Sequence, residues 1–379
     1  DSHTAVYDPA SNSMMVFGGR ADSGPLADTW VLTNANNQGG TPTWSTLATT
    51  GGPPAARANH SAVYDPASNR MVVYGGDDAT GVTPAMFSDV WVLTNANGLG
   101  GAAVWSALAT SGGPPATRTQ HSAVYDDANN RMIVFGGNPT AGSCVAGLND
   151  VWVLTNANGI GGAATWSQLA PTGGPPAARR SQNAAYDAAN NLLIVFGGDL
   201  DCATSSNEVW TLSEANGLGG TPAWSLVSTS GTTPSSWSFH SGAYDTGLNR
   251  LTAFGGLVSG TPSNAGLNLS SANGVGGPFA WSNLATNAYQ PAARSLHSAI
   301  AESATHRMVV FAGLGASGRL NDTWVLEETQ GGTSVSARGV FPVRDSSGNV
   351  VGGLVVRHDI GALYAGMRSG VLQALAFLL

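Results

Sequence analysis

Hydrophobic and polar positions alternate in short runs along most of the chain, and the runs recur with a long period. The clearest copy has apolar runs over residues 60–65, 71–75, 89–93 and 104–108. Each run is rich in Val, Met, Ile, Tyr and Trp, and lies between segments rich in Asp, Pro, Asn and Gly. Short β-branched and aromatic runs between turn-forming residues predict strands. We therefore predict four strands in each copy.

A pair of glycines closes the second strand of each copy and gives the period. The pairs begin at Gly18, Gly75, Gly136, Gly197 and Gly255, with Ala312 in a weaker sixth copy, so the spacings are 57, 61, 61, 58 and 57 residues. Fifteen residues before each pair stand His3, His60, His121, Gln182, His240 and His297. Tryptophans mark the third strand (Trp30, Trp91, Trp152, Trp210, Trp324) and the fourth (Trp44, Trp105, Trp166, Trp224, Trp281). A four-stranded unit repeated six times predicts a β-propeller.

The repeat resembles the Kelch family of β-propellers. The residues that carry the resemblance are the Arg-x-x-His opening (Arg57 to His60), the Tyr-Asp turn that ends in Asn-Arg, the glycine pair, and the tryptophans of the third and fourth strands. The resemblance implies an all-β fold, a six-bladed Kelch-like β-propeller over residues 1–332. The expected blades span residues 1–50, 57–111, 118–172, 179–230, 237–287 and 294–332.

Residues 333–379 follow a different pattern. Residues 338–358 predict a β-hairpin turning at Asp345 to Gly348, and Asp359 is placed to cap a C-terminal helix that runs to Leu379. This tail resembles the closing hairpin and exit helix of extracellular Cache-type sensor domains. Its apolar end is too short to cross a bilayer unless a span follows.

The sixth copy lacks a fourth-strand tryptophan, so its outer edge needs another partner. We expect Val340 to Arg344, or Leu354 to Arg357, to pair with the third strand of blade six. Pairing within the chain is favoured and gives a monomer. The alternative is strand exchange between chains, which gives an oligomer.

Composition narrows the functional classes. All fifteen basic residues are arginine, the net charge is −8, and no basic cluster is present, which disfavours nucleic-acid binding. Abundant Gly, Ala, Thr, Ser and Asn is typical of a secreted or periplasmic bacterial protein. The chain starts in the middle of a repeat, so we expect a processed N-terminus. Cys144 and Cys202 lie in loops of adjacent blades and are predicted to form a disulfide in an oxidising compartment.

The sequence offers no constellation for metal binding or catalysis. Each recurring histidine belongs to a different blade and lacks a second ligand nearby, so we expect buried or channel-facing histidines whose ring nitrogens are satisfied by neighbouring backbone. The Asn-Ala-Asn-Gly segments carry no alternating carboxylates and are predicted to be turns. No nucleophile elbow and no phosphate-binding loop occurs. We therefore expect no metal, no cofactor and no catalytic residues.

Four blades begin with an arginine and start their third strand with an acid, and both positions should lie on one side of the glycine pair. We predict a charge-assisted ion pair in each of these blades. The pairs are Arg57 with Asp89, Arg118 with Asp150, Arg179 with Glu208, and Arg294 with Asp322. The fifth blade has Trp237 and Ala265 instead, so both partners are lost together.

The loops from second to third strand differ between copies, whereas those from third to fourth strand barely change. Variable loops on a rigid scaffold are typical of binding surfaces. We expect this face to bind a protein or glycan partner through Asp22, Asp77, Asp78, Met86, Phe87, Asn138, Asp199 and Asp201. Two other interpretations are the ligand-sensing part of a bacterial membrane receptor, and a glycan oxidase or hydrolase. Drift on an unused surface would produce the same variability.

Overall fold

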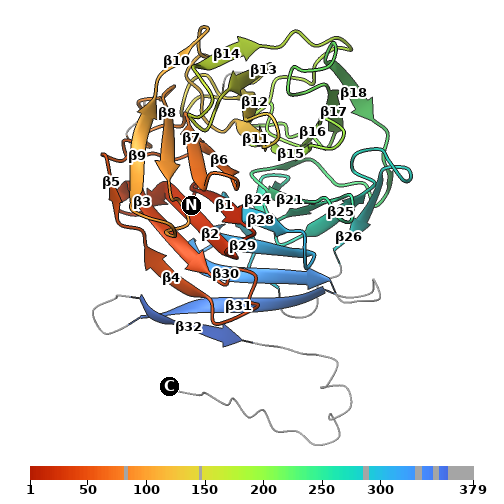
Figure 1. Ribbon diagram of the computed structural model, residues 1–379. Coiled ribbons are helices and arrows are strands. Elements are labelled where there is room, and N and C mark those ends of the chain that lie inside the picture. Colours follow the sequence, from red (N-terminus) through yellow and green to blue (C-terminus); the bar gives the residue numbers. More distant parts are fainter. Residues whose placement is uncertain (81–83, 145–146, 285–289, 329–334, 345–349, 357–379) are drawn as a thin grey trace, which may run out of the picture.

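The computed structural model describes the chain apart from residues 81–83, 145–146, 285–289, 329–334, 345–349 and 357–379. The regular elements in the described part are all β-strands, and they form a radial array of sheets around a central axis (Figure 1). The predicted six-bladed propeller is thus confirmed. The helix predicted from Asp359 lies outside the described residues.

Each of the first five blades is an antiparallel meander of four strands, from the axis outwards. Blade one contains β1 (Thr4–Asp8), β2 (Ser13–Ala21), β3 (Gly24–Thr33) and β4 (Thr43–Thr46). Blade two contains β6 (Ser61–Asp65), β7 (Arg70–Tyr74), β8 (Val90–Thr94) and β9 (Ala103–Leu108). Blade three contains β11 (Ser122–Asp126), β12 (Arg131–Gly137), β13 (Leu148–Thr155) and β14 (Ala164–Gln168). The boundaries predicted for blade two differ from these by one residue at most.

The next two blades repeat this order. Blade four contains β15 (Asn183–Asp187), β16 (Leu192–Phe196), β17 (Val209–Ser213) and β18 (Ala223–Val227). Blade five contains β21 (Ser241–Asp245), β22 (Arg250–Phe254), β25 (Gly266–Ser270) and β26 (Ala280–Asn283). Two-residue strands from the preceding linker, β5 (Thr49–Thr50), β10 (Thr110–Ser111) and β19 (Ser230–Gly231), pair in parallel with β9, β14 and β26. Short bridging strands are β20 (Trp237–Ser238), β23 (Leu257–Val258), β24 (Thr261–Pro262) and β27 (Arg294–Ser295).

The tail completes blade six within the chain. This blade contains β28 (Ser298–Glu302), β29 (Arg307–Gly315), β30 (Gly318–Glu328), β31 (Val335–Arg344) and β32 (Val350–Val356). β31 pairs with β30 over Val335 to Val340, whereas Val340 to Arg344 was predicted. The offset arises because pairing already includes Glu328 opposite Val335, five residues before Val340. β32 then pairs with β31 as the predicted hairpin. The likeness of this tail to sensor domains stays a prediction.

Aromatic contacts join neighbouring blades. The fourth-strand tryptophan of one blade packs on the second-strand aromatic of the blade before it, as for Trp105 on Phe17, whose ring centroids are 4.9 Å apart. The same contact recurs for Trp166 on Tyr74, Trp224 on Phe135, Trp281 on Phe196 and Trp44 on Phe311. In blade six the register places Ala337 opposite Leu326, where other blades place their tryptophan. The junction of blades five and six therefore lacks this aromatic contact.

A belt of side-chain bonds links the blades on the face that carries the first-to-second-strand turns. In this Asn–acid belt, an Asn of each third-to-fourth-strand loop donates to the acid that ends the first strand of the preceding blade. The pairs are Asn36 with Glu302, Asn97 with Asp8, Asn158 with Asp65, Asn216 with Asp126 and Asn273 with Asp187, at 2.6–3.3 Å. At the remaining junction His306 contacts Asp245 instead, with Nδ1 and Oδ2 2.7 Å apart.

Candidate functional site

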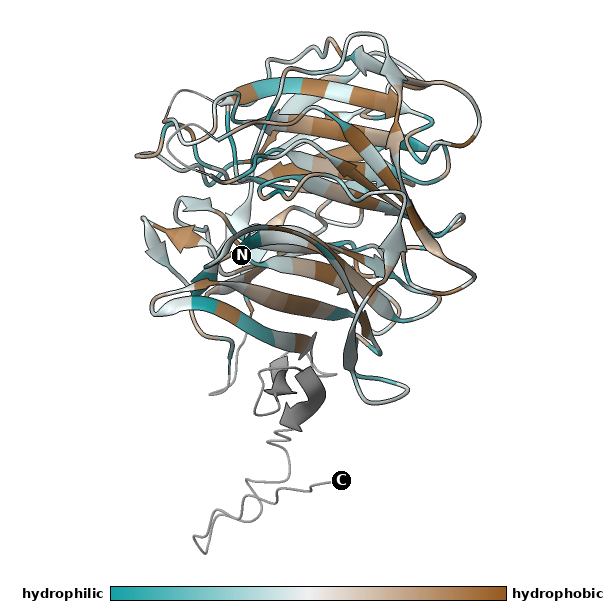
Figure 2. Ribbon diagram, turned by 90° about the vertical axis from the view of Figure 1, so that its left-hand side faces the viewer, coloured by the Kyte–Doolittle hydropathy of each residue, from teal (hydrophilic) through white to brown (hydrophobic). Residues whose placement is uncertain are grey.

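The strands run between two faces that carry the loops, as the side view shows (Figure 2). The variable face carries the second-to-third-strand loops and the links between blades, as an up-and-down meander requires. The belt face carries the first-to-second-strand and third-to-fourth-strand loops, together with the Asn–acid belt. Residues that line hollows are found mainly on the variable face.

A closed ring of main-chain hydrogen bonds surrounds the axis on the variable face. The residue before each recurring histidine or glutamine donates its N–H to the carbonyl of the matching residue in the preceding blade, at 2.9–3.1 Å. We call these the ring residues: Ser2, Asn59, Gln120, Ser181, Phe239 and Leu296. All six have left-handed backbone conformation, with φ of 52–57°. Ser2 donates to Leu296, so this contact closes the ring between the first and last blades.

The ring residues line an axial hollow with a volume of about 140 Å³. Their backbones are equivalent but their side chains differ. Blades one to four contribute hydroxyl and amide groups, whereas blades five and six contribute Phe239 and Leu296. The hollow therefore has a hydrogen-bonding arc and an apolar arc.

Two side hollows adjoin the axial one. The first lies between blades two and three, is lined by Arg20, Asn59, Asp77 and Gln120, and has a volume of about 240 Å³. The backbone of Arg20 bonds to Asp1, and its guanidinium has no hydrogen-bond or ion-pair partner among the side chains that the structure describes. The second, about 290 Å³, includes Gln120, Arg180, Cys202 and Phe239.

The recurring histidines lie directly behind the ring, and four of the five bond through Nε2 to a hydroxyl of an adjacent blade, whereas the ring nitrogens of His240 have no partner among the described residues. Nε2 of His121 is bonded to Ser61 Oγ at 2.8 Å, and equivalent bonds join His3 to Ser298, His60 to Thr4 and His297 to Ser241. Blade four has Gln182 at this position, and its amide donates to Ser122 Oγ at 3.1 Å. Burial lowers the pKa of His60, His240 and His297 to about 3 and that of His3 and His121 well below 6.5. These rings are therefore neutral and serve packing between blades.

The four arginine–acid pairs predicted from the sequence are present. The shortest nitrogen–oxygen distances are 2.7 Å for Arg57–Asp89 and Arg294–Asp322, 2.8 Å for Arg118–Asp150 and 2.9 Å for Arg179–Glu208. Each arginine is fully buried and also donates to the main-chain carbonyl of the first residue of the glycine pair. Burial by itself would raise the pKa of the Asp150 carboxyl. Hydrogen bonds and charge from Arg118, together with a hydrogen bond from Trp152, outweigh this effect, so the pKa lies below its usual value.

In blade five a tryptophan, rather than an arginine, bonds to the carbonyl of the first glycine of the pair. The indole N–H of Trp237 donates to the carbonyl of Gly255, the position that an arginine serves in other blades. Trp237 is also buried against Phe196 and His240. The bond to the glycine carbonyl is thus kept although the ion pair is lost.

Three of the eight residues expected to bind a partner are buried within the loops. Asp77, Asn138 and Asp199 all follow the glycine pair and are 2–5% exposed. Asp77 accepts hydrogen bonds from Asn59 and Thr119, so it joins blades two and three. These three side chains form hydrogen bonds that hold the loops around the hollows in place.

The other five lie nearer the surface. Asp22 pairs with Arg319 across blades one and six, and Asp78 accepts from the main chain of Ala85. Met86 Sδ accepts from the main chain of Ala141. The Phe87 ring covers the Arg57 guanidinium at 4.2 Å from the ring centroid. Two backbone N–H groups, from Thr204 and Ala203, lower the pKa of the exposed carboxyl of Asp201. Their contact with a partner stays a prediction.

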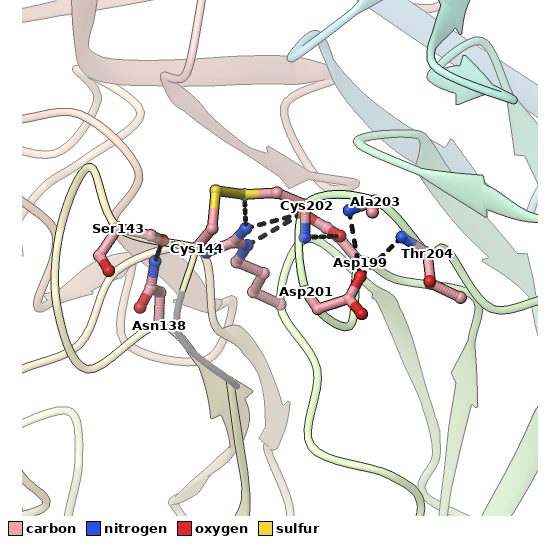
Figure 3. Close-up of a disulfide and its surroundings, with 9 residues drawn as sticks. Asn138, Ser143, Cys144, Asp199, Asp201, Cys202, Ala203 and Thr204 are labelled. Carbon is pink, nitrogen blue, oxygen red and sulfur yellow. Dashed lines mark hydrogen bonds and ion pairs between the residues drawn. A yellow bond between two sulfur atoms is a disulfide. The ribbon is translucent and has the colours of Figure 1, made fainter.

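Cys144 and Cys202 form a disulfide that joins the second-to-third-strand loops of blades three and four (Figure 3). Arg180 is buried beside it, where its guanidinium contacts Cys202 Sγ, Asp199 and the Ser143 carbonyl. The bridge therefore fixes one wall of the second side hollow.

The ring residues are not among the binding residues predicted from the sequence. Their signal is the position immediately before each recurring histidine, which holds Ser, Asn, Gln, Ser, Phe and Leu in turn. The sequence shows a variable position beside one that is histidine in five of six copies, but only the closed geometry places all six variable residues together at the axis.

The fold and the recurring contacts define a Kelch-type β-propeller. The KLHDC2/KLHL20/DRC7 Kelch-repeats domain matches residues 1–98, 40–217 and 188–378, and the chain belongs to this Kelch-repeat family. Membership indicates a protein-binding type of module. Within the described residues, no group of three or more His, Cys, Asp or Glu side chains is placed to hold a metal ion. None of the described segments is a helix long and apolar enough to cross a membrane.

Relatives match parts of longer proteins. The chain is 28% identical over 225 residues to Adagio-like protein 3 of Oryza sativa subsp. japonica, a match that covers 58% of this chain and 32% of that protein. It is 31% identical over 189 residues to Multiple epidermal growth factor-like domains protein 8 of Mus musculus, which covers 49% of this chain and 6% of that protein. The chain thus spans less than a third of these relatives. The solved structure of YjhT has a TM-score of 0.65 at 12% identity, covers 89% of this chain and 96% of its own, and shows the fold alone.

Proposed function

We propose that the chain is a non-enzymatic binding module that takes a protein or glycan partner on its variable face, centred on the axial hollow. The observation that carries the proposal is the ring: six equivalent backbone positions, closed by hydrogen bonds, present six side chains of differing chemistry to one hollow. A scaffold that is held constant while its contact residues change is typical of a recognition surface.

Backbone strain at two ring positions supports this assignment. Left-handed conformation suits Asn and Gly and is unfavourable for bulky residues, yet Phe239 and Leu296 adopt it with φ of 55°. Strained residues of this kind concentrate at functional sites. If these positions served only the ring of main-chain bonds, a smaller or more tolerant residue would serve it better.

The lining indicates what the partner presents. Phe239 and Leu296 offer an apolar surface, and across the axis Asn59 and Gln120 offer amide donors and acceptors. Arg20, beside the polar arc, is free to bind a carboxylate or a hydroxyl-rich group. An amphipathic group, such as a side chain from a protein loop or one sugar ring, has the matching chemistry.

The disulfide supports an extracytoplasmic location as part of the same proposal. Disulfides persist in oxidising compartments and are rare in reducing ones. The bridge between Cys144 and Cys202 also borders a hollow of the variable face. A rigid wall at this place lowers the ordering cost of binding.

Binding by the full chain to a glycan array and to a displayed peptide library tests the proposal. The variants are Asn59→Ser, Gln120→Ser and Phe239→Ser, because serine already occupies the equivalent positions Ser2 and Ser181 and preserves the ring. We expect at least a tenfold loss of affinity for a bound probe with Phe239→Ser. Leu99→Gln on the belt face is the matched control and should leave affinity unchanged.

Two outcomes would contradict the proposal. One is a bound probe whose affinity is unaffected by all three serine variants. The other is chemical turnover of the bound probe, which would assign an enzymatic activity.

A further inference from the structure

Four exposed aliphatic side chains occupy one repeated position on the belt face. They lie between two glycines in the third-to-fourth-strand loops of blades two to five, and we call them the aliphatic arc: Leu99, Ile160, Leu218 and Val275, which are 57%, 44%, 39% and 57% exposed. Single exposed apolar residues are ordinary, but the same exposed position filled four times is a surface feature.

The loops hold these side chains at fixed positions. The N–H of Leu99 donates to Asn97 Oδ1 at 2.8 Å, and its carbonyl accepts from Asn69 Nδ2 at 3.1 Å. The same pair of bonds fixes Ile160, Leu218 and Val275. Because equivalent loops fix each main chain, the four side chains project from one face in the same way.

The repeats show that apolar character is kept while identity changes. The position changes between Leu, Ile and Val in loops whose other residues scarcely vary. Blade one has Gln38, which makes the same two main-chain bonds, so the loop also accepts a polar residue. The Gln38 amide oxygen, in the orientation that satisfies both groups, accepts from Arg307. The fold therefore does not require an aliphatic residue here.

Most charged side chains that the structure describes around the arc are engaged by neighbouring groups. Arg70 and Arg131 donate to main-chain carbonyls of the next blade, and the belt acids are engaged by asparagines. Glu214, in the same loop as Leu218, is half-buried and accepts from Asn191, whereas Asp127 in a neighbouring turn is exposed. A surface whose arginines are engaged in this way and which exposes an acid does not attract anionic lipids or nucleic acid.

The size and spacing of the aliphatic arc indicate which kind of partner can cover it. Four part-exposed aliphatic side chains on separate loops provide much less contact than the roughly 1,200–2,000 Å² of a stable protein–protein interface. A second copy would also need complementary pockets at four separate points. A fluid apolar medium accepts each side chain independently and needs no such complementarity.

We propose that the belt face docks onto a lipid surface with uncharged, zwitterionic headgroups, into which the aliphatic arc inserts. This surface lies opposite the hollows of the variable face, so a membrane-docked molecule keeps its variable face towards solution. The inference is independent of the ligand proposed for that face.

Co-sedimentation of the full chain with phosphatidylcholine vesicles tests the proposal. The test variant carries Leu99→Gln, Ile160→Gln, Leu218→Gln and Val275→Gln, since Gln38 shows that glutamine fits the loop. We expect the partition coefficient to fall at least tenfold, with an unchanged melting temperature. Replacing part of the phosphatidylcholine with phosphatidylserine should weaken binding, because the chain carries a net charge of −8.

The matched control is Val104→Gln with Leu226→Gln, which removes two exposed apolar residues from outer strands rather than from the arc. Both proteins retain the apolar C-terminal sequence, so its contribution cancels. Equal partitioning of wild type and the arc variant would overturn the proposal, as would no binding by wild type. Self-association of wild type without lipid that the arc variant loses would assign the arc to a second copy instead. If the fourfold variant melts early, Leu99→Gln alone should still lower partitioning at least twofold.

Discussion

The variable face and the belt face are built from the same repeats, but the first keeps only its backbone bonds constant and the second also keeps its side-chain bonds constant. On the variable face the backbone of the ring is uniform while its side chains run from serine to phenylalanine. On the belt face the side chains are uniform as well, because an asparagine and an acid from adjacent blades bond at five junctions. In the third-to-fourth-strand loops of this face, the exposed position between two glycines is aliphatic in four blades.

The difference shows where this propeller can vary without losing its junctions. Main-chain bonds do not depend on which side chain a residue carries, so the ring is kept while its side chains differ. Buried side-chain bonds tolerate almost none, since an unpaired buried polar group costs about 1–3 kcal/mol. The belt face therefore carries stability, and the variable face is available for recognition.

Acidification should have the largest effect, through the histidines behind the variable face. Burial lowers the folded pKa of His60, His240 and His297 to about 3, against about 6.5 when unfolded. The unfolded state thus binds more protons between these pH values. Stability should be full above pH 6.5 and fall as pH drops towards 3, by about 1.4 kcal/mol per pH unit for each histidine.

Denaturant unfolding followed from pH 8 to pH 4 measures this dependence. His121→Gln, which copies the natural Gln182 of blade four, should fold and reduce the slope by one proton. A slope unchanged in this variant would show that other groups take up the protons.

Removal of a belt acid should have the next largest effect. Asp126→Ala leaves the amides of Asn216 and Asn129 without their shared acceptor, so we expect a loss of about 3 kcal/mol in unfolding free energy. The adjacent, exposed Asp127→Ala is the control and should change stability by less than about 0.5 kcal/mol. Chemical denaturation measures both. Similar losses of unfolding free energy in the two variants would show that the buried acid of the belt contributes no more stability than an exposed acid beside it.

Breaking one ion pair beneath the variable face should cost about as much or slightly less. Asp150→Ala leaves the fully buried Arg118 without its carboxylate, at an expected cost of about 3 kcal/mol. Adding Arg118→Trp copies blade five, where Trp237 bonds the glycine carbonyl and no acid is present. The double variant should recover part of the loss in melting temperature. A double variant less stable than Asp150→Ala would mean that the two arrangements cannot be exchanged between blades.

The smallest effect, of opposite sign, is expected at the ring itself. Leu296→Asn relieves a left-handed leucine and should raise unfolding free energy by about 0.5 kcal/mol. The same variant should weaken binding at the axial hollow. A loss above about 1 kcal/mol would instead indicate that the leucine is held for packing.

Much of the fold was predictable because the strand, turn and ion-pair residues recur at the same interval in successive repeats. Strand positions in blade two, the count of blades, the arginine–acid pairs and the disulfide partners all followed from residues that recur at fixed intervals. The offset of β31 and the exchange of Arg for Trp237 were not predicted. Both depend on which partner lies nearest in space, and that is a property of the assembled blades.

The candidate site was predictable as a face but not as a set of residues. Variable loops pointed to the face that carries the hollows, whose binding role stays a prediction, and Asp77, Asn138 and Asp199 are buried within those loops. The residues that line the axis sit beside the histidines and are separated from one another by about a blade of sequence. No local pattern relates them, because their proximity comes from closure of the ring.

The repeated signals specify the Kelch-type propeller, the number of blades and the arginine–acid pairs within four of the sheets, because those depend on residues close together in a repeated unit. How the last blade is completed, which polar residues are buried and which six side chains meet at the axis depend on the assembled blades. Radial closure brings residues from every blade to one point, and this convergence has no counterpart along the chain.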